Sequence, residues 1–281
     1  MKRYIFILSV LCSLLLSALS VKAQAYSKFY FTHINGENGL SASNVKTILQ
    51  DSYGFMWFGT KNGLNRYDGT SVLQLNCDDQ IAGTGNHNIS ALYEDKDRKL
   101  WVGTDRGIYL YDPAMDIFTH LKPESSDKIT PDNWVAEILA DSTGNIWALT
   151  PDQGLFRFNG TDKVSHYPIT DKSNLKNESP ECIAVNKKGE VWVGTSGVGL
   201  YKYNQDKDSF EQYLTDCNGK SLINKNIMSI CFQNDDIILA IHEGELLKYN
   251  THTRQFTNIP FPGERQTFLR DIVCFGDELW V

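Results

Sequence analysis

The chain has 281 residues, with 27 Lys and Arg against 34 Asp and Glu, and a formal net charge of −7 at pH 7. The length is ample for a large hydrophobic core. The acidic balance argues against a nucleic-acid partner, because binding to phosphates needs a basic face.

The N-terminus has the pattern of a secretory signal peptide. Lys2 and Arg3 precede an apolar stretch over residues 5–19, and Val21-Lys22-Ala23 places small residues where a signal peptidase reads. We expect cleavage before Gln24, with cleavage after Ala25 as an alternative. An uncleaved anchor helix is a third interpretation, although the apolar stretch is short for a membrane span of about 20 residues.

Residues 1–23 are therefore predicted to be a signal peptide and residues 24–281 the mature, secreted chain. Removing the signal peptide takes away three basic residues and leaves 24 against 34 acidic ones, a net charge of −10. The mature chain keeps five cysteines whose spacings match no zinc or redox motif: Cys77, Cys182, Cys217, Cys231 and Cys274. We expect buried, structural cysteines, and the sequence leaves one unnamed disulfide open.

One phrase recurs: a Trp, a small apolar residue, Gly-Thr, a polar stretch and Gly-Leu. The Trp residues are spaced by 44, 46 and 45 positions, and the phrase begins at Trp57, Trp101, Trp147 and Trp192. Residues 44–76 show how one period is built, with alternating or apolar strands over 44–50, 55–60, 64–67 and 72–75 separated by Gly-, Asn- and Asp-containing turns.

The same four strands are expected four more times, beginning near Asn88, Trp134, Ser179 and Asn226. A sixth copy starts near Phe268 and contributes only part of its strands. A period of this length with four short strands predicts an all-β fold. We predict a β-propeller of four-stranded antiparallel blades, with about five blades and a partial sixth, an incomplete ring. The segment 29–34 resembles a fourth strand that completes the last blade.

Residues that return every period are predicted to be structural. The Trp side chains fill the space between blades, and the Gly two positions after three of them is also predicted to be structural, at Gly59, Gly103 and Gly194. The final Glu278-Leu279-Trp280-Val281 reads as the start of another Trp phrase. We therefore expect the chain to be a C-terminally truncated part of a longer protein.

The first repeat resembles a known family. Gly39-Leu40-Ser41-Ala42-Ser43-Asn44-Val45, followed by Asp51-x-x-Gly54-x-x-Trp57-Phe58-Gly59-Thr60-x-x-Gly63-Leu64-Asn65-Arg66-Tyr67-Asp68-Gly69, is similar to the two-component regulator propeller repeat. The resemblance covers roughly residues 29–281 and implies the periplasmic sensor region of a hybrid two-component system.

The resemblance also implies the rest of the parent protein: a further propeller, a β-sandwich, a membrane helix and a histidine kinase. None of these is in this chain, so we expect no enzymatic activity and no cofactor from it. Many family members sense oligosaccharides released from glycans, which makes an oligosaccharide the expected ligand. A homodimer through the propeller faces is compatible with this hypothesis.

Candidate ligand-binding residues lie where the repeat varies. The turns between second and third strands share one propeller face with the connections between blades, and they carry Lys61, Asn62, Asp105, Arg106, Asp152 and Gln153, then His242 and Glu243. Trp134 stands where earlier repeats have Asn44 and Asn88, so it is placed to stack on a sugar ring or to cap a blade interface. Each turn residue can also be a solvated surface residue.

The alternative function is a propeller enzyme, a lyase or hydrolase, or a lectin-like propeller. Streptogramin-lyase-like propellers carry similar phrases, and Asp105 and Asp152 are carboxylates of the kind that glycan cleavage requires.

His33, His120 and His166 occupy one position in successive outer strands. Because blades fan apart outward, we expect surface histidines there and no metal site.

Overall fold

The computed structural model describes residues 31–75, 88–125, 129–169, 179–213, 215, 216, 218, 219, 221–260 and 268–281. Residues 34–281 form one compact unit. The described part is built from short antiparallel strands, which confirms the prediction of an all-β fold with four-stranded sheets. The predicted signal peptide lies outside the described residues.

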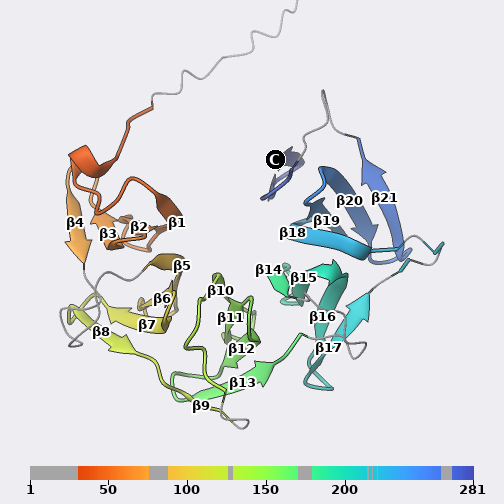
Figure 1. Cartoon of the computed structure of the whole chain (residues 1–281), viewed down its shortest axis with the longest axis horizontal. Coiled ribbons are helices and arrows are strands. Elements are labelled where there is room, and N and C mark those ends of the chain that lie inside the picture. Colours follow the sequence, from red (N-terminus) through yellow and green to blue (C-terminus); the bar gives the residue numbers. More distant parts are fainter. Residues whose placement is uncertain are drawn as a thin grey trace, which may run out of the picture. The chain divides into compact units, whose positions relative to one another are not determined.

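Five groups of four antiparallel strands follow one another in chain order (Figure 1), and we number these groups sheets 1 to 5. The 3-10 turn η1 (Gly36–Asn38) precedes them. Sheet 1 contains β1 (Val45–Gln50), β2 (Met56–Thr60), β3 (Gly63–Tyr67) and β4 (Val72–Leu75). Sheet 2 contains β5 (Ile89–Glu94), β6 (Leu100–Thr104), β7 (Gly107–Asp112) and β8 (Ile117–His120).

The later sheets repeat this order. Sheet 3 contains β10 (Glu137–Ala140), β11 (Ile146–Thr150), β12 (Gly154–Phe158) and β13 (Lys163–Tyr167), and β9 (Glu124–Ser125) adds a parallel edge to β13. Sheet 4 contains β14 (Pro180–Val185), β15 (Val191–Val198), β16 (Leu200–Asn204) and β17 (Ser209–Tyr213). Sheet 5 contains β18 (Ile223–Gln233), β19 (Asp236–Ile241), β20 (Glu245–Asn250) and β21 (Gln255–Ile259). The sixth repeat supplies the hairpin β22 (Val273–Phe275) and β23 (Glu278–Trp280).

Three details differ from the sequence-based expectation. Residues 31–34, the described part of the expected fourth strand at 29–34, are in no strand. The first strand of the third repeat begins at Glu137, and Trp134 lies in the loop before it. Sheets 4 and 5 are joined, because Ser196 and Val198 at the end of β15 pair with Asn226 and Ile223 of β18.

The turn between first and second strands explains the Asp-x-x-Gly-x-x-Trp spacing. In sheet 3, Asp141 Oδ1 accepts the backbone N–H groups of Thr143 and Asn145, and Oδ2 accepts Trp147 Nε1 at 2.9 Å. One carboxylate therefore closes the turn and holds the indole. Equivalent bonds join Asp51 to Trp57 and Asp95 to Trp101.

Sheet 4 breaks this arrangement. Asn186 Oδ1 still accepts the turn N–H groups, but Asn186 Nδ2 is a donor and is directed to Glu190 Oε2 at 2.6 Å. Trp192 Nε1 is buried and has no hydrogen-bond partner among the described residues. An amide thus replaces the carboxylate at the one position where the indole needs an acceptor.

The Thr and Gly of the repeated phrase close the next turn. The buried Thr60, Thr104, Thr150 and Thr195 each donate a hydroxyl hydrogen bond, at 2.6–3.1 Å, to the carbonyl oxygen of the Gly that opens the third strand or, in sheet 4, immediately precedes it. The Gly before the Thr has a different reason. A Cβ on Gly59 would lie 2.7 Å from Ile89 Cγ2 of the next sheet. The sheets can therefore approach closely only at a residue without a side chain.

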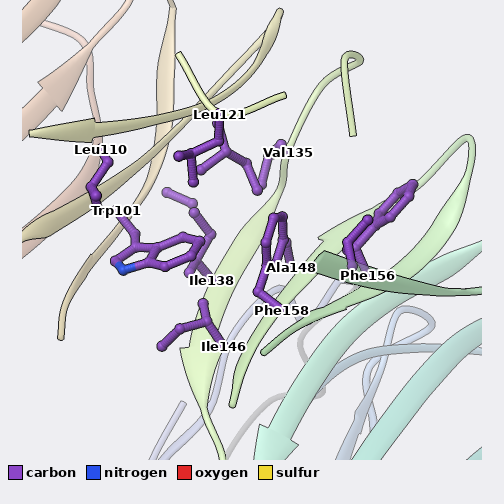
Figure 2. Close-up of a cluster of buried hydrophobic side chains, with 12 residues drawn as sticks. Trp101, Leu110, Leu121, Val135, Ile138, Ile146, Ala148, Phe156 and Phe158 are labelled. Carbon is purple, nitrogen blue, oxygen red and sulfur yellow. The ribbon is translucent and has the colours of Figure 1, made fainter. Parts of the chain in front are cut away.

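The core lies between successive sheets. Figure 2 shows the cluster between sheets 2 and 3, where Trp101 packs with Ile138, Ile146 and Phe158. The Trp101 and Phe158 rings meet edge to face at 5.1 Å. Burying a side chain of this size contributes roughly 2–3 kcal/mol, so each sheet is stabilised mainly by its neighbours.

Cysteines contribute one covalent link to the same stack. Cys231 of β18 and Cys274 of β22 form a disulfide across 43 positions of the chain. In the chain-entropy account, a loop of this length stabilises the fold by about 4 kcal/mol. Cys182 is buried and reduced, and burial raises the pKa of its thiol well above the usual value. Cys77 and Cys217 lie outside the described residues.

The first strands of sheets 1 to 5 and residues 271–272, just before β22, line a cavity of about 460 Å³. Glu137 is the acidic residue that β10 contributes, and its Oε2 accepts the backbone N–H of Ile183 in the next sheet at 2.8 Å. Burial raises the pKa of Glu137 to about 7, the Ile183 hydrogen bond opposes that shift, and the negative charge of Asp271 in the same cavity adds to it.

We predict that Asp141→Asn lowers the free energy of unfolding by about 1–2 kcal/mol, because it recreates the unpaired indole of sheet 4. Urea denaturation of the expressed chain measures this. Asp97→Asn, an exposed turn carboxylate, is the matched control and should leave stability unchanged. Equal stability of the Asp141 variant and the wild type would show that the Asp141–Trp147 bond contributes nothing.

We predict that Glu137 makes the fold less stable as pH rises. The pKa of Glu137 is higher in the folded chain than its ordinary value of 4.5, so folding favours the protonated form. The stabilisation from protonated Glu137 is fully present below pH ~4.5. It falls by up to ~3 kcal/mol as the pH rises from ~4.5 through ~7. Unfolding free energies at pH 5 and pH 8 should differ less in Glu137→Gln than in the wild type. Glu243→Gln, an exposed turn residue, should keep the full pH dependence.

Candidate functional site

The predicted binding residues lie at the turns between second and third strands and at the segments that connect the sheets. We call the segment of residues 129–135, which leads into sheet 3, the bridge segment. Val135 at its end is buried and donates its N–H to Thr104 O at 2.9 Å. The bridge segment is therefore anchored to sheet 2 immediately before β10 begins.

Gly107 brings the β6–β7 turn against the bridge segment. Its N–H donates to Asn133 O at 3.1 Å, and a Cβ on it would lie 2.6 Å from Pro131 O. Its φ of +98° is in the region that favours glycine. Asp105 and Arg106 form the exposed tip of this turn, so both predicted residues lie beside the bridge segment.

Trp134 is the exposed aromatic residue of the bridge segment, and 47% of its surface is accessible. Its neighbours in the chain are buried or anchored. It immediately precedes Val135, which packs against Gly103 as Ile89 packs against Gly59. Trp134 therefore occupies the same position as Asn88 in the preceding repeat, as its sequence alignment indicated. The loop geometry holds its backbone and leaves its ring available to solvent.

The β11–β12 turn meets the other end of the bridge segment. Gln153 Nε2 donates to Thr130 O at 3.2 Å, while Gln153 N donates to Thr150 O. Asp152 is exposed at the tip of this turn. The bridge segment thus joins five of the seven predicted binding residues: Asp105, Arg106, Trp134, Asp152 and Gln153.

Lys61 and Asn62 are placed differently. Asn62 donates its side-chain amide to Ser41 O at 3.0 Å and its backbone N–H to Thr60 Oγ1, so it closes the β2–β3 turn of sheet 1. Lys61 is exposed beside it. Among the described residues, no hydrogen bond connects either of them to the bridge segment.

A cavity of about 350 Å³ opens beside the β11–β12 turn. Gly154, with φ +97°, allows the chain leaving β13 to approach this turn, because a Cβ there would lie 2.5 Å from Tyr167 O. The walls come from the turn, the bridge segment, the end of β13 and the start of β14. They consist of Ile129, Pro151, Asp152, Gln153, Gly154, His166, Pro168, Ile169 and Pro180.

His166 belongs to this cavity, contrary to the expectation that it is a surface residue of an outer strand. Its Nε2 hydrogen-bonds Gln153 O at 2.6 Å, and its ring stacks on Phe156 at 4.8 Å. His120 stacks on Tyr109 in the same way. The equivalent positions of the two histidines in successive repeats were visible in the sequence, but their packing onto third-strand aromatic rings was not.

A second hollow of about 330 Å³ lies at the turns between first and second strands of sheets 3 and 4. Its charged side chains are already paired: Lys202 with Glu190 at 2.6 Å, and Arg157 with Asp208 at 2.9 Å. In the part of the chain that the structure describes, no three His, Cys, Asp or Glu side chains gather as a metal site.

Comparison with known proteins supports the repeat assignment. The sequence model of the two component regulator propeller matches residues 39–62 and 83–106. The histidine kinase P4 of Formosa agariphila is 48% identical over 52 residues, which are 18% of this chain and 4% of the kinase.

Two solved structures from B. thetaiotaomicron share the fold. The extracellular domain of the putative hybrid two component system BT3049 has a TM-score of 0.69 and 24% identity, covering 89% of this chain and 33% of that one. The corresponding domain of BT4673 has a TM-score of 0.56 and 21% identity, covering 84% and 36%. The chain thus spans about a third of the length of these structures.

No helix among the described residues combines the length and apolar character needed to cross a membrane. The repeated phrase, the four-stranded sheets and the matched segments agree with one another. Residues 39–62 and 83–106 match the two-component regulator propeller repeat, and the fold is that of the extracellular domains of the two hybrid two component systems.

Proposed function

We propose that the chain is the ligand-sensing part of a hybrid two-component regulator, located in the periplasm, and that its ligand is an oligosaccharide derived from a glycan. In this proposal the chain does no catalysis, and a kinase elsewhere in the parent protein produces the signal. The matched repeats and the likeness to extracellular domains support a sensor. A membrane helix, a further propeller, a β-sandwich and a homodimer belong to the proposal for the parent protein.

The observation that carries the sugar ligand is the exposed Trp134 on an anchored bridge segment. Sugar rings present C–H groups on their faces, which pack on aromatic rings, and hydroxyl groups on their edges, which need hydrogen-bond partners. Arg106 and Asp152 at the flanking turn tips supply such partners. Because the bridge segment is held at both ends, little conformational entropy is lost when Trp134 is covered.

We predict that Trp134→Ala weakens oligosaccharide binding at least tenfold, since it removes the stacking surface. Isothermal titration calorimetry of the wild-type chain against a panel of glycan-derived oligosaccharides measures this. Trp280→Ala is the matched control, because Trp280 is also an exposed tryptophan, with 65% of its surface accessible. It should leave the affinity unchanged.

Two results would count against the proposal. If no oligosaccharide of the panel binds the wild-type chain, the ligand class is wrong. If a ligand binds but Trp134→Ala and the wild type have the same affinity, the binding site lies away from the bridge segment.

A further inference from the structure

Phe268 has the same place in the sixth repeat as Trp134 has in the third. Val273 of β22 is aligned with Leu139 of β10, because each pairs with the tryptophan of its second strand. Phe268 lies five residues before Val273, and Trp134 lies five residues before Leu139. Both aromatic residues therefore precede the first strand of their repeat, at the same end of that strand.

The other four repeats have small polar residues at this position: Asn44, Asn88, Ser179 and Asn226. Their sheets stack without an aromatic ring there, so the packing of the sheets does not require Trp134 or Phe268. Both side chains are exposed, and 63% of the surface of Phe268 is accessible. Two separate replacements by an aromatic residue at one solvent-facing position favour a shared contact with a ligand.

The backbone next to Phe268 is held by the fold. Leu269 is buried, and its N–H donates to His242 O at 3.3 Å, so the segment before β22 is attached to the β19–β20 turn. The Phe268 ring contacts the His242 ring, with 5.0 Å between the ring centroids. Phe268 is thus a preformed surface for stacking, and covering it costs little conformational entropy.

The cavity lined by the first strands adjoins both aromatic positions. The third residue after Trp134 is Glu137, and this residue lines the cavity. The third residue after Phe268 is Asp271, which lines it too. The negative charge of Asp271 contributes to the raised pKa of Glu137, so these two side chains approach each other in the cavity. Three residues of extended chain span at most about 11 Å, which places both aromatic residues beside the cavity.

The lining of this cavity suits hydroxyl groups better than anionic groups. Its polar and charged residues include Lys46, Thr47, Ser90, Glu137, Ser229 and Asp271. The carboxyl groups of Glu137 and Asp271 can accept hydrogen bonds from sugar hydroxyl groups that lose their hydration on binding. A uronate or sulfate group would instead bring a negative charge beside two carboxyl groups and one lysine, which is unfavourable. The cavity therefore selects a neutral sugar.

Resting on the proposed function, we infer that Phe268 is a second stacking residue for the sugar ligand, and that this ligand is a neutral oligosaccharide long enough to lie across the cavity from Trp134 to Phe268. Sugar rings at its two ends stack on the two aromatic rings, and hydroxyl groups of the rings between them bond to the polar lining of the cavity. Once one end is bound, the second contact is intramolecular. The affinity therefore rises with ligand length until both aromatic rings are covered.

The test measures the affinity of the wild-type chain for cello-, malto-, xylo- and manno-oligosaccharides, from dimers to octamers, by isothermal titration calorimetry. The octamer of the series that binds should have an affinity at least tenfold above that of its dimer. Phe268→Ala should lose this gain and keep the affinity for the dimer. Phe275→Ala is the matched control, because Phe275 is an exposed phenylalanine of β22, and it should keep the full gain.

Two further measurements separate ligand recognition from structure and test the charge of the ligand. Phe268→Trp restores an aromatic surface and should keep the gain with length. Oligogalacturonides of the same lengths should bind the wild-type chain at least tenfold more weakly than the neutral series.

The inference is overturned if the wild-type affinity does not rise with length, if Phe268→Ala keeps the gain, or if the oligogalacturonides bind more tightly than the neutral sugars. In each of these cases, Trp134-dependent binding of an oligosaccharide still supports the proposed function. The absence of binding by every oligosaccharide, neutral or acidic, overturns both.

Discussion

Each sheet in this chain has two faces to bury, and a single four-stranded sheet has nothing of its own to cover either. Stacking on neighbours solves this, and the recurring tryptophan is the side chain that fills the space between sheets. The carboxylate of Asp51, Asp95 or Asp141 then holds the indole nitrogen and the turn together. The repeat is therefore conserved within the chain where two sheets meet, and it is free to vary at the turns that face solvent.

The departures from the repeat carry the functional hypotheses. Trp134 and Phe268 each replace a small polar residue before a first strand. Glu137 puts an acid between the inner ends of sheets 3 and 4, where other repeats have Thr47, Ala91, Cys182 and Ser229. Asn186 leaves Trp192 Nε1 without a hydrogen-bond partner among the described residues. Each of these departures from the repeat costs some stability. Natural sequences tolerate such a cost mainly where function or a compensating contact requires the departure.

Much of the fold was predictable because the period and the strand alternation are local. The positions of the sheets and the alignment of Trp134 with Asn88 both follow from counting residues. The Asp–Trp hydrogen bond and the Gln153 cavity could not be predicted in this way, because each depends on how segments approach in space. His166 shows the difference: its place in the repeat was visible, but its contacts with Gln153 and Phe156 depend on the register of β12 and β13, in which His166 pairs with Phe156.

The account places the ligand on the bridge segment and its two flanking turns. Hydrogen–deuterium exchange of the chain with and without a bound oligosaccharide tests this directly, since it reports on every backbone segment at once. The account predicts that the ligand slows exchange in residues 129–135 and 151–154, with little change in the turn at 186–190. Protection confined to the 186–190 turn and the neighbouring hollow, with none on the bridge segment, would contradict it.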